Sequence, residues 1–187
     1  MCGRYALISS LTDFGKNFGV EGPPPEVSVA DRYNIAPTQP VLIVRENQET
    51  GSGRRELTHV VWGLIPSWAE SPDIASRLIN ARAETAAEKP AFRNAFRRRR
   101  CLIPASGFYE WQMVPAGETS SPDTTAHGGS EPDFFGAKTR RGPIRRPWYF
   151  HLRGHRPFAF AGLWETWNGP HGELLESCTI LTTRSSG

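Results

Sequence analysis

Apolar and polar residues alternate in several short runs of this chain, which is the pattern of strands with one buried face. The runs begin with "GRYALIS" (3–9), and "YNIAPTQPVLIVRE" (33–46) reads as a turn followed by a strand. "ELTHVVWGLIPSWA" (56–69) predicts a strand that ends in a loop, and "CLIPASGFYEWQ" (101–112) predicts another strand. The last third, from 147 to 183, indicates three strands joined by hairpins.

Helical patterns are few and short. "LTDFGKNF" (11–18) predicts a short helix capped by Ser10 or Thr12, and "AETAAEKPAFRNAF" (83–96) predicts one or two helices broken at Pro90. "EGPPPEV" (21–27) is expected to be extended, because consecutive prolines forbid a helix. Many strands with a few helices predict an α+β domain around a mainly antiparallel, barrel-like sheet.

Residues 113–146 depart from this pattern. They are rich in Ser, Thr, Gly, Pro and Asp and contain little that could be buried. We therefore expect a long loop or flexible insertion there.

Length and composition favour one ordinary globular domain covering residues 1–187. The chain is 38% apolar and 22% charged. No basic stretch with a following apolar run opens it, and no stretch approaches the roughly 18 apolar residues of a membrane span. We expect a soluble, cytoplasmic monomer that does not bind membranes.

The three cysteines are Cys2, Cys101 and Cys178, which form neither a paired framework nor a CxxC spacing. Structural disulfides and a metal site are therefore not expected, and nothing in the sequence calls for a cofactor. Cys101 and Cys178 lie in apolar runs, where a buried thiol usually acts as a small hydrophobic side chain.

Arginine dominates the basic residues, since Lys occurs only at positions 16, 89 and 138. The overall net charge is +3, but residues 77–101 alone carry a net +6. The guanidinium fork grips phosphate oxygens in pairs, so the cluster indicates contact with a polyanion. A solvated surface is the alternative for the "RRRR" run (97–100).

Cys2 stands directly behind the initiator methionine in "MCGRY". Methionine is removed efficiently when the second residue is small, so the mature chain is expected to begin at Cys2. Its free amine and thiol would then lie on adjacent carbons.

Seven stretches together resemble the SRAP family, the SOS response-associated peptidases that process abasic sites in DNA. They are "MCGRY", "YNIAPTQ", "WGLIPSW", "INARAET", "RCLIPASGFYEW", "FAGLWE" and "SCTILTT". The resemblance runs in order through the chain apart from residues 113–146. It implies a β-rich α+β domain with a positive cleft for single-stranded DNA, in which Cys2 attacks the abasic sugar.

The chemistry of Cys2 fits an aldehyde substrate such as the open form of an abasic deoxyribose. An α-amine with a pKa of about 7.7–8.0 is partly neutral at pH 7 and can form an imine. The neighbouring thiol can then close on the imine carbon to form a five-membered thiazolidine.

Two further residues are candidates for catalysis. Glu110 interrupts the aromatic strand "GFYEW", where a carboxylate would be partly desolvated and could move protons; a surface position on an edge strand is the alternative. Asn80 in "INARAET" matches the family's active-site asparagine and would orient the Cys2 amine or the sugar, although it could merely cap a helix.

Four residues are candidates for DNA binding. Arg4 and Arg82 match family arginines that hold phosphates beside the lesion, with ordinary surface ion pairing as the alternative. Trp68 and Trp111 could stack on unpaired bases, although either could belong to the core.

One departure from the family concerns a histidine in a His-x-Arg motif downstream of the "TILTT" strand. The sequence ends at Gly187, before this motif, and none of its five histidines stands in a matching context. The domain is therefore expected to be incomplete at its C-terminus, which puts steps that need a second acid–base group in doubt.

Other classes of protein share single features with this sequence. Glutamine amidotransferases with an N-terminal cysteine also begin with "MCG", but they share neither Arg4 nor the "NARAET" and "GFYEW" stretches. A thiol peptidase is a further possibility, without an internal Cys/His pairing to support it. A non-catalytic module that binds single-stranded DNA is the non-enzymatic alternative.

Overall fold

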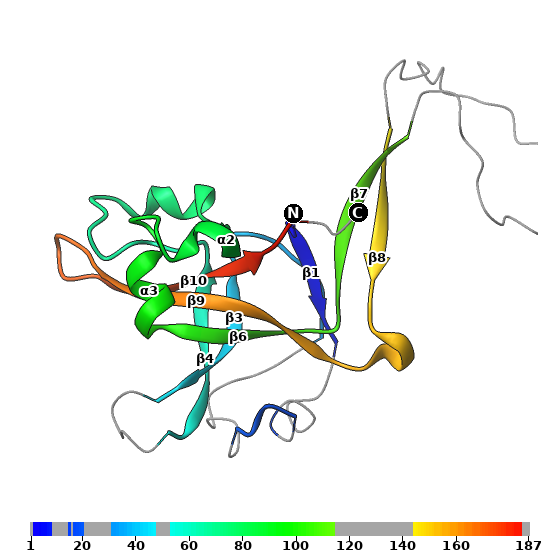
Figure 1. Cartoon of the computed structure of the whole chain (residues 1–187), viewed down its shortest axis with the longest axis horizontal. Helices are drawn as coiled ribbons and strands as arrows, with labels where there is room; N and C mark the ends of the chain where they lie inside the picture. Colours follow the sequence, from blue (N-terminus) through cyan, green and yellow to red (C-terminus); the bar gives the residue numbers. More distant parts are fainter. Residues whose placement is uncertain are drawn as a thin grey trace, which may run out of the picture. The chain divides into compact units, whose positions relative to one another are not determined.

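The computed structural model describes residues 2–8, 15, 17–20, 31–47, 53–114 and 144–184 (Figure 1). The chain divides into two compact units. The main unit comprises Met1–Glu110 with Tyr149–Gly187, and the second unit comprises Trp111–Trp148.

A barrel-like sheet forms the centre of the main unit. In spatial order its strands are β4 (Arg55–Trp62), β3 (Pro40–Glu46), β6 (Arg100–Ala105), β9 (Phe158–Asn168), β10 (Leu174–Thr182) and β5 (Asn80–Arg82). β10 also pairs in parallel with β4, through Ser177 with Val61 and Cys178 with Trp62, and this pairing closes the sheet. The expected barrel-like, mainly antiparallel sheet is confirmed, with parallel pairings where β10 meets β4 and β5.

The closed sheet buries the apolar face of each strand. Tyr5 and Trp62 are fully buried and meet edge to face, with ring centroids 5.4 Å apart. Cys101 and Cys178 lie in the same core, where burial raises the pKa of Cys101 to about 12. Both thiols are therefore the small hydrophobic side chains that the sequence predicts, because they are buried and at neutral pH protonated.

A second, four-stranded sheet has the order β2 (Arg32–Ile35), β1 (Arg4–Leu7), β7 (Gly107–Val114) and β8 (Ile144–Phe150). The "CLIPASGFYEWQ" stretch is thus two strands in two sheets, and β2 lies where only a turn was predicted. The backbone N–H of Ser106, between β6 and β7, donates to the Ala6 carbonyl at 2.8 Å, which anchors this change of sheet. Gly107 lets the Tyr149 ring approach closely, because a Cβ there would lie 2.3 Å from that ring.

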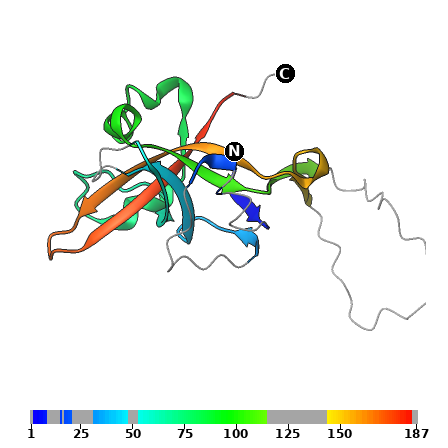
Figure 2. The ribbon, with the colours of Figure 1, turned by 90° about the horizontal axis from the view of Figure 1, so that it is seen from below.

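Short helices cover one side of the barrel (Figures 1 and 2). They are the 3-10 helix η1 (Pro72–Arg77) and the α-helices α2 (Ala83–Ala86) and α3 (Arg93–Arg98), which pack through Ala86, Phe92 and Ala95. The predicted break at Pro90 is confirmed, whereas η1 and β5 were not predicted. A further short turn, η2 (Arg153–His155), precedes β9.

The predicted helix at 11–18 and the extended segment at 21–27 lie mostly or wholly outside the described residues. Of the predicted insertion, residues 113–114 end β7 and residues 144–146 begin β8, so the expected loop is too long at both ends. Residues 115–143 lie outside the described part of the chain. Within the described ranges, no helix is long and apolar enough to cross a membrane.

Candidate active site around Cys2

Cys2 lies immediately before β1 and is only 7% exposed. Its Sγ lies 3.8 Å from the Arg4 carbonyl oxygen, to which it donates a weak hydrogen bond. Burial raises the pKa of the Cys2 thiol to about 11, and the negative charge of Glu110 acts in the same direction. At pH 7 only about one thiol in 10⁴ is therefore ionised, so the thiol by itself is a poor nucleophile.

Asn80 holds the main chain of Cys2. It is the first residue of β5, which is positioned by its parallel pairing with the end of β10, where Asn80 is the partner of Ile180. Its Nδ2 donates a 2.8 Å hydrogen bond to the Cys2 carbonyl oxygen. The N-cap of the following helix is Arg82, so the structure excludes the helix-capping alternative for Asn80.

The amide oxygen of Asn80, Oδ1, is buried and has no hydrogen-bond partner among the described residues. A buried acceptor without a partner costs about 1–3 kcal/mol.

Glu110 reaches the site from β7. The antiparallel register of β1 and β7 pairs Arg4 with Tyr109, which places Glu110 opposite Gly3, the neighbour of Cys2. Glu110 is half-buried, and its charge acts on the Cys2 thiol. Strand pairing thus brings together Cys2, Asn80 and Glu110 from three distant parts of the chain.

Arg4 and Arg82 are each two residues from a member of this group. An Arg4 terminal nitrogen donates to Asn34 Oδ1 at 2.9 Å, and Arg82 donates to the Thr183 carbonyl oxygen at 2.9 Å. Both hydrogen-bond acceptors are neutral, so these contacts orient the guanidinium groups. The charge of Arg82 also acts on Glu84, whose pKa is lowered chiefly by hydrogen bonds from backbone N–H groups. Asn34 had no predicted role, although it lies within the "YNIAPTQ" stretch.

The two candidate tryptophans are on the surface. Trp68 is 57% exposed and Trp111 is 42% exposed, so neither belongs to the core. Trp68 lies in the loop after β4, beside Ala69, whose carbonyl accepts a 2.7 Å hydrogen bond from Trp167 Nε1. Trp111 belongs to the second unit.

The described side chains offer no group of three His, Cys, Asp or Glu residues that could hold a metal ion. Around Cys2 the structure places the thiol of that residue, the Asn80 amide and the Glu110 carboxylate.

Two relatives match nearly all or all of this chain. The abasic site processing protein YoqW of Bacillus subtilis is 38% identical to this chain, over 98% of this chain and 69% of the length of YoqW. The abasic site processing protein HMCES of Xenopus tropicalis is 31% identical over 100% of this chain and 58% of its own length.

Solved structures share the fold. A protein from Bacteroides thetaiotaomicron superposes with a TM-score of 0.72 at 24% identity, over 99% of this chain and 69% of that chain. A family model described as SOS response associated peptidase (SRAP) matches residues 1–187. The chain therefore belongs to the SRAP family.

Proposed function

We propose that this protein processes abasic sites in DNA by capturing them covalently through Cys2, after Met1 has been removed by an aminopeptidase or by the protein itself. The names of its relatives give the class of lesion. The observation that carries the proposal is the hydrogen bond from Asn80 Nδ2 to the Cys2 carbonyl, with the Glu110 charge acting on the same residue. Together they hold the nucleophilic residue beside a proton acceptor.

The reaction begins at the α-amine. The abasic sugar opens to an aldehyde, the neutral amine of Cys2 adds to its carbonyl carbon, and loss of one water leaves a C=N bond. The sulfur of the same residue then adds to that carbon while the thiol proton passes to the nitrogen. The product is a thiazolidine that joins Cys2 to the sugar, and the only molecule released is the water.

The position of both nucleophiles on one residue supports this order of events. Once the imine has formed, ring closure by the thiol is intramolecular and so gains from proximity. Glu110 is suited to accept and return protons during ring opening and water loss. While Met1 remains attached, the nitrogen of Cys2 is an amide and cannot start the reaction.

Binding of the DNA strand is assigned to four side chains. In the main unit, Arg4 and Arg82 are proposed to hold phosphates beside the lesion, and the exposed ring of Trp68 to stack on an unpaired base. The exposed ring of Trp111, in the second unit, is proposed by itself as a further surface for base stacking. We further propose that the substrate strand is single-stranded, because only unpaired bases present their faces to such rings. The protein would act as a cytoplasmic monomer that associates with the nucleoid when bound to DNA.

Intact mass spectrometry tests both parts of the proposal. The purified protein should have lost the mass of Met1, and incubation with a single-stranded oligonucleotide containing one abasic site should add the mass of that oligonucleotide less one water. An undamaged oligonucleotide of the same sequence should add nothing. A chain whose N-terminus is extended by an uncleavable tag should also form no adduct.

The alternative functions give different results. A non-catalytic module would bind the strand without any change in mass. An amidohydrolase or thiol peptidase would release ammonia from glutamine or cleave a peptide, and would leave the abasic strand free. Either result would contradict covalent capture by Cys2.

A further inference from the structure

A hollow of about 680 Å³ lies in the main unit, where β3 and β6 meet. These two strands pair through Val44 and Leu102, and both residues line the hollow. Leu102 and Trp164 contribute apolar walls. The volume lies within the range of about 300–1,000 Å³ typical of small-ligand sites.

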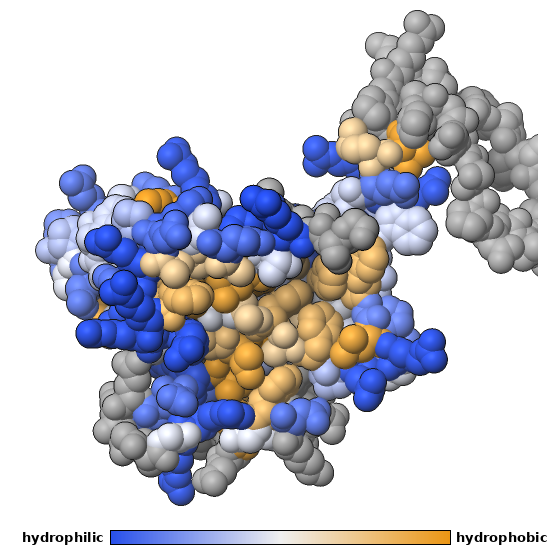
Figure 3. Space-filling view, in the orientation of Figure 1, coloured by the Kyte–Doolittle hydropathy of each residue, from blue (hydrophilic) through white to orange (hydrophobic). Residues whose placement is uncertain are grey.

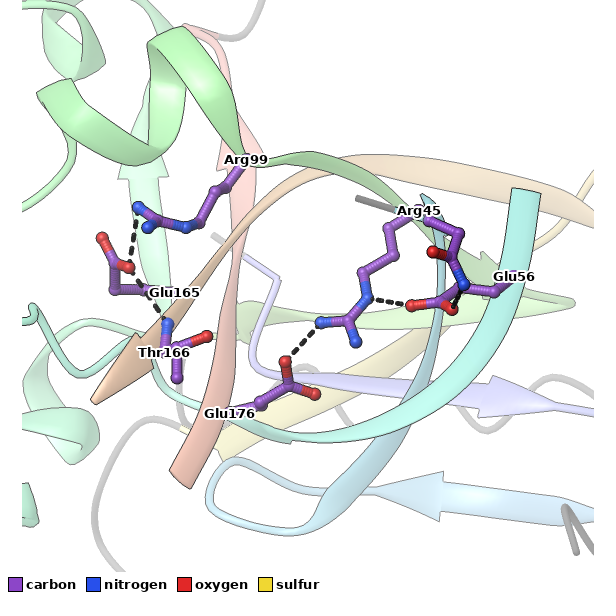
Figure 4. Close-up of polar contacts among 7 residues, drawn as sticks. Arg45, Glu56, Arg99, Glu165, Thr166 and Glu176 are labelled. Carbon is purple, nitrogen blue, oxygen red and sulfur yellow. Dashed lines mark hydrogen bonds and ion pairs between the residues drawn. The ribbon is translucent and has the colours of Figure 1, made fainter. Parts of the chain in front are cut away.

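Arg45 lines the hollow and is held in place by several contacts. Arg45 donates to Glu56 and Glu176 at 2.6 Å each (Figure 4). Its guanidinium carbon also lies 4.1 Å from the centre of the Trp164 ring. Asn47 Nδ2 donates to the second oxygen of Glu56 at 2.7 Å. Both carboxylates pair with the Arg45 guanidinium, so this residue has a structural role in the hollow.

The rim of the hollow is basic. Arg55, Arg98 and Arg100 line it against a single glutamate, Glu46, and all three arginines are exposed. Arg98 is the last residue of α3 and Arg100 is the first residue of β6. Two of the four arginines of the "RRRR" run, Arg98 and Arg100, therefore lie at this rim. Arg99 points elsewhere, since it forms a 2.9 Å ion pair with the buried Glu165 (Figure 4).

The hollow is separate from the Cys2 site. Glu176, which holds Arg45, lies four residues before Ile180 in β10, and Ile180 pairs with Asn80. At about 3.3 Å per residue, Glu176 and Ile180 are about 13 Å apart along β10. On the face seen in Figure 3, hydrophilic side chains surround a central apolar area. The lining of the hollow is likewise mixed, since arginines and the apolar side chains of Leu102 and Trp164 both contribute to it.

We propose that this hollow is a second phosphate-binding site, which accepts a nucleotide unit of a nucleic-acid strand. Exposed arginines in a concave rim suit the planar, bidentate contacts that phosphate oxygens make. Leu102 and the edge of Trp164 would lie against the sugar or base. A strand held at both sites would be fixed in register relative to Cys2, and a free nucleotide is the other source of the same chemistry.

The test uses the full chain carrying Cys2→Ser, so that covalent capture plays no part and its failure cannot affect the result. Binding of a fluorescent, undamaged single-stranded oligonucleotide of 30 nucleotides is measured by anisotropy over a range of salt concentrations. We expect R98Q/R100Q to weaken binding about 3- to 30-fold. The slope of log affinity against log salt should fall by about 1.4, as expected for two lost phosphate contacts.

Matched variants distinguish the hollow from general charge. R77Q/R93Q removes the same charge from the same basic stretch outside the hollow, and should change affinity less than R98Q/R100Q. R98K/R100K keeps the charge but not the planar fork, so it should restore the salt dependence but only part of the lost affinity. Thermal melting checks that each variant is folded.

Titration with a mononucleotide separates the two sources of phosphate. If only the long strand depends on Arg98 and Arg100, the hollow binds a nucleic-acid backbone. If the mononucleotide binds and also loses affinity in R98Q/R100Q, the hollow takes free nucleotides. Equal effects of R98Q/R100Q and R77Q/R93Q on the strand, with no mononucleotide binding, would overturn the proposal.

Discussion

Asn80 offers the sharpest test of how the structure positions the nucleophile. Replacing it with alanine removes the 2.8 Å hydrogen bond to the Cys2 carbonyl and leaves that partly buried oxygen without its donor. Such a loss costs about 1–3 kcal/mol. If the whole cost appears as misplacement of Cys2 in the transition state, the rate of adduct formation falls about 5- to 150-fold.

Asn80→Asp is the matched variant, because it keeps the shape but replaces the donor with a carboxylate. Its negative charge would face the Cys2 carbonyl and the nearby Glu110, so the rate should fall at least as far as in Asn80→Ala. The assay is single-turnover formation of a heat-stable adduct, followed on denaturing gels with protein in excess over an abasic oligonucleotide.

A free aldehyde separates positioning from general damage to the fold. Acetaldehyde is small and needs no alignment, so its capture by Cys2 should be nearly unchanged in both variants. DNA affinity should also stay close to wild type. If Asn80→Ala forms the abasic adduct at the wild-type rate while its melting temperature drops, then Asn80 stabilises the fold and does not position Cys2.

Three further substitutions test the remaining roles. Cys2→Ser should abolish the heat-stable adduct but retain DNA binding, because a hydroxyl closes the ring far less readily than a thiol; an adduct at wild-type yield would refute the thiazolidine. Glu110→Gln should slow capture by about 10²–10⁴-fold and remove one limb of the pH–rate profile, with DNA affinity nearly unchanged. A wild-type rate from pH 5 to 8 would make Glu110 structural. Arg4→Gln and Arg82→Gln should weaken binding to undamaged and abasic strands alike and flatten the salt dependence. An effect confined to the abasic strand would mean that these arginines read the lesion.

The sequence by itself determined the type of most elements. Alternation of apolar and polar residues is a local property, so it identified β1, β3, β4, β9 and β10, and Pro90 marked the break between the short helices. The position of Cys2 behind Met1 and the ordered motifs indicated the family and its chemistry. These signals need no knowledge of which strand pairs with which.

Tertiary structure decided what those elements bring together. β5 has three residues, too few for a periodic pattern, and only its pairing with β10 places Asn80 against Cys2, 78 positions away in sequence. Arg45 looks like the polar end of an apolar strand, yet it meets Glu176 across 131 positions. Burial of one face produces the same alternation of apolar and polar residues whichever strand is the partner, so the sequence pattern does not identify the partner. Closure of the barrel decides which strands pair. It thereby forms both the Cys2 site and the arginine-lined hollow.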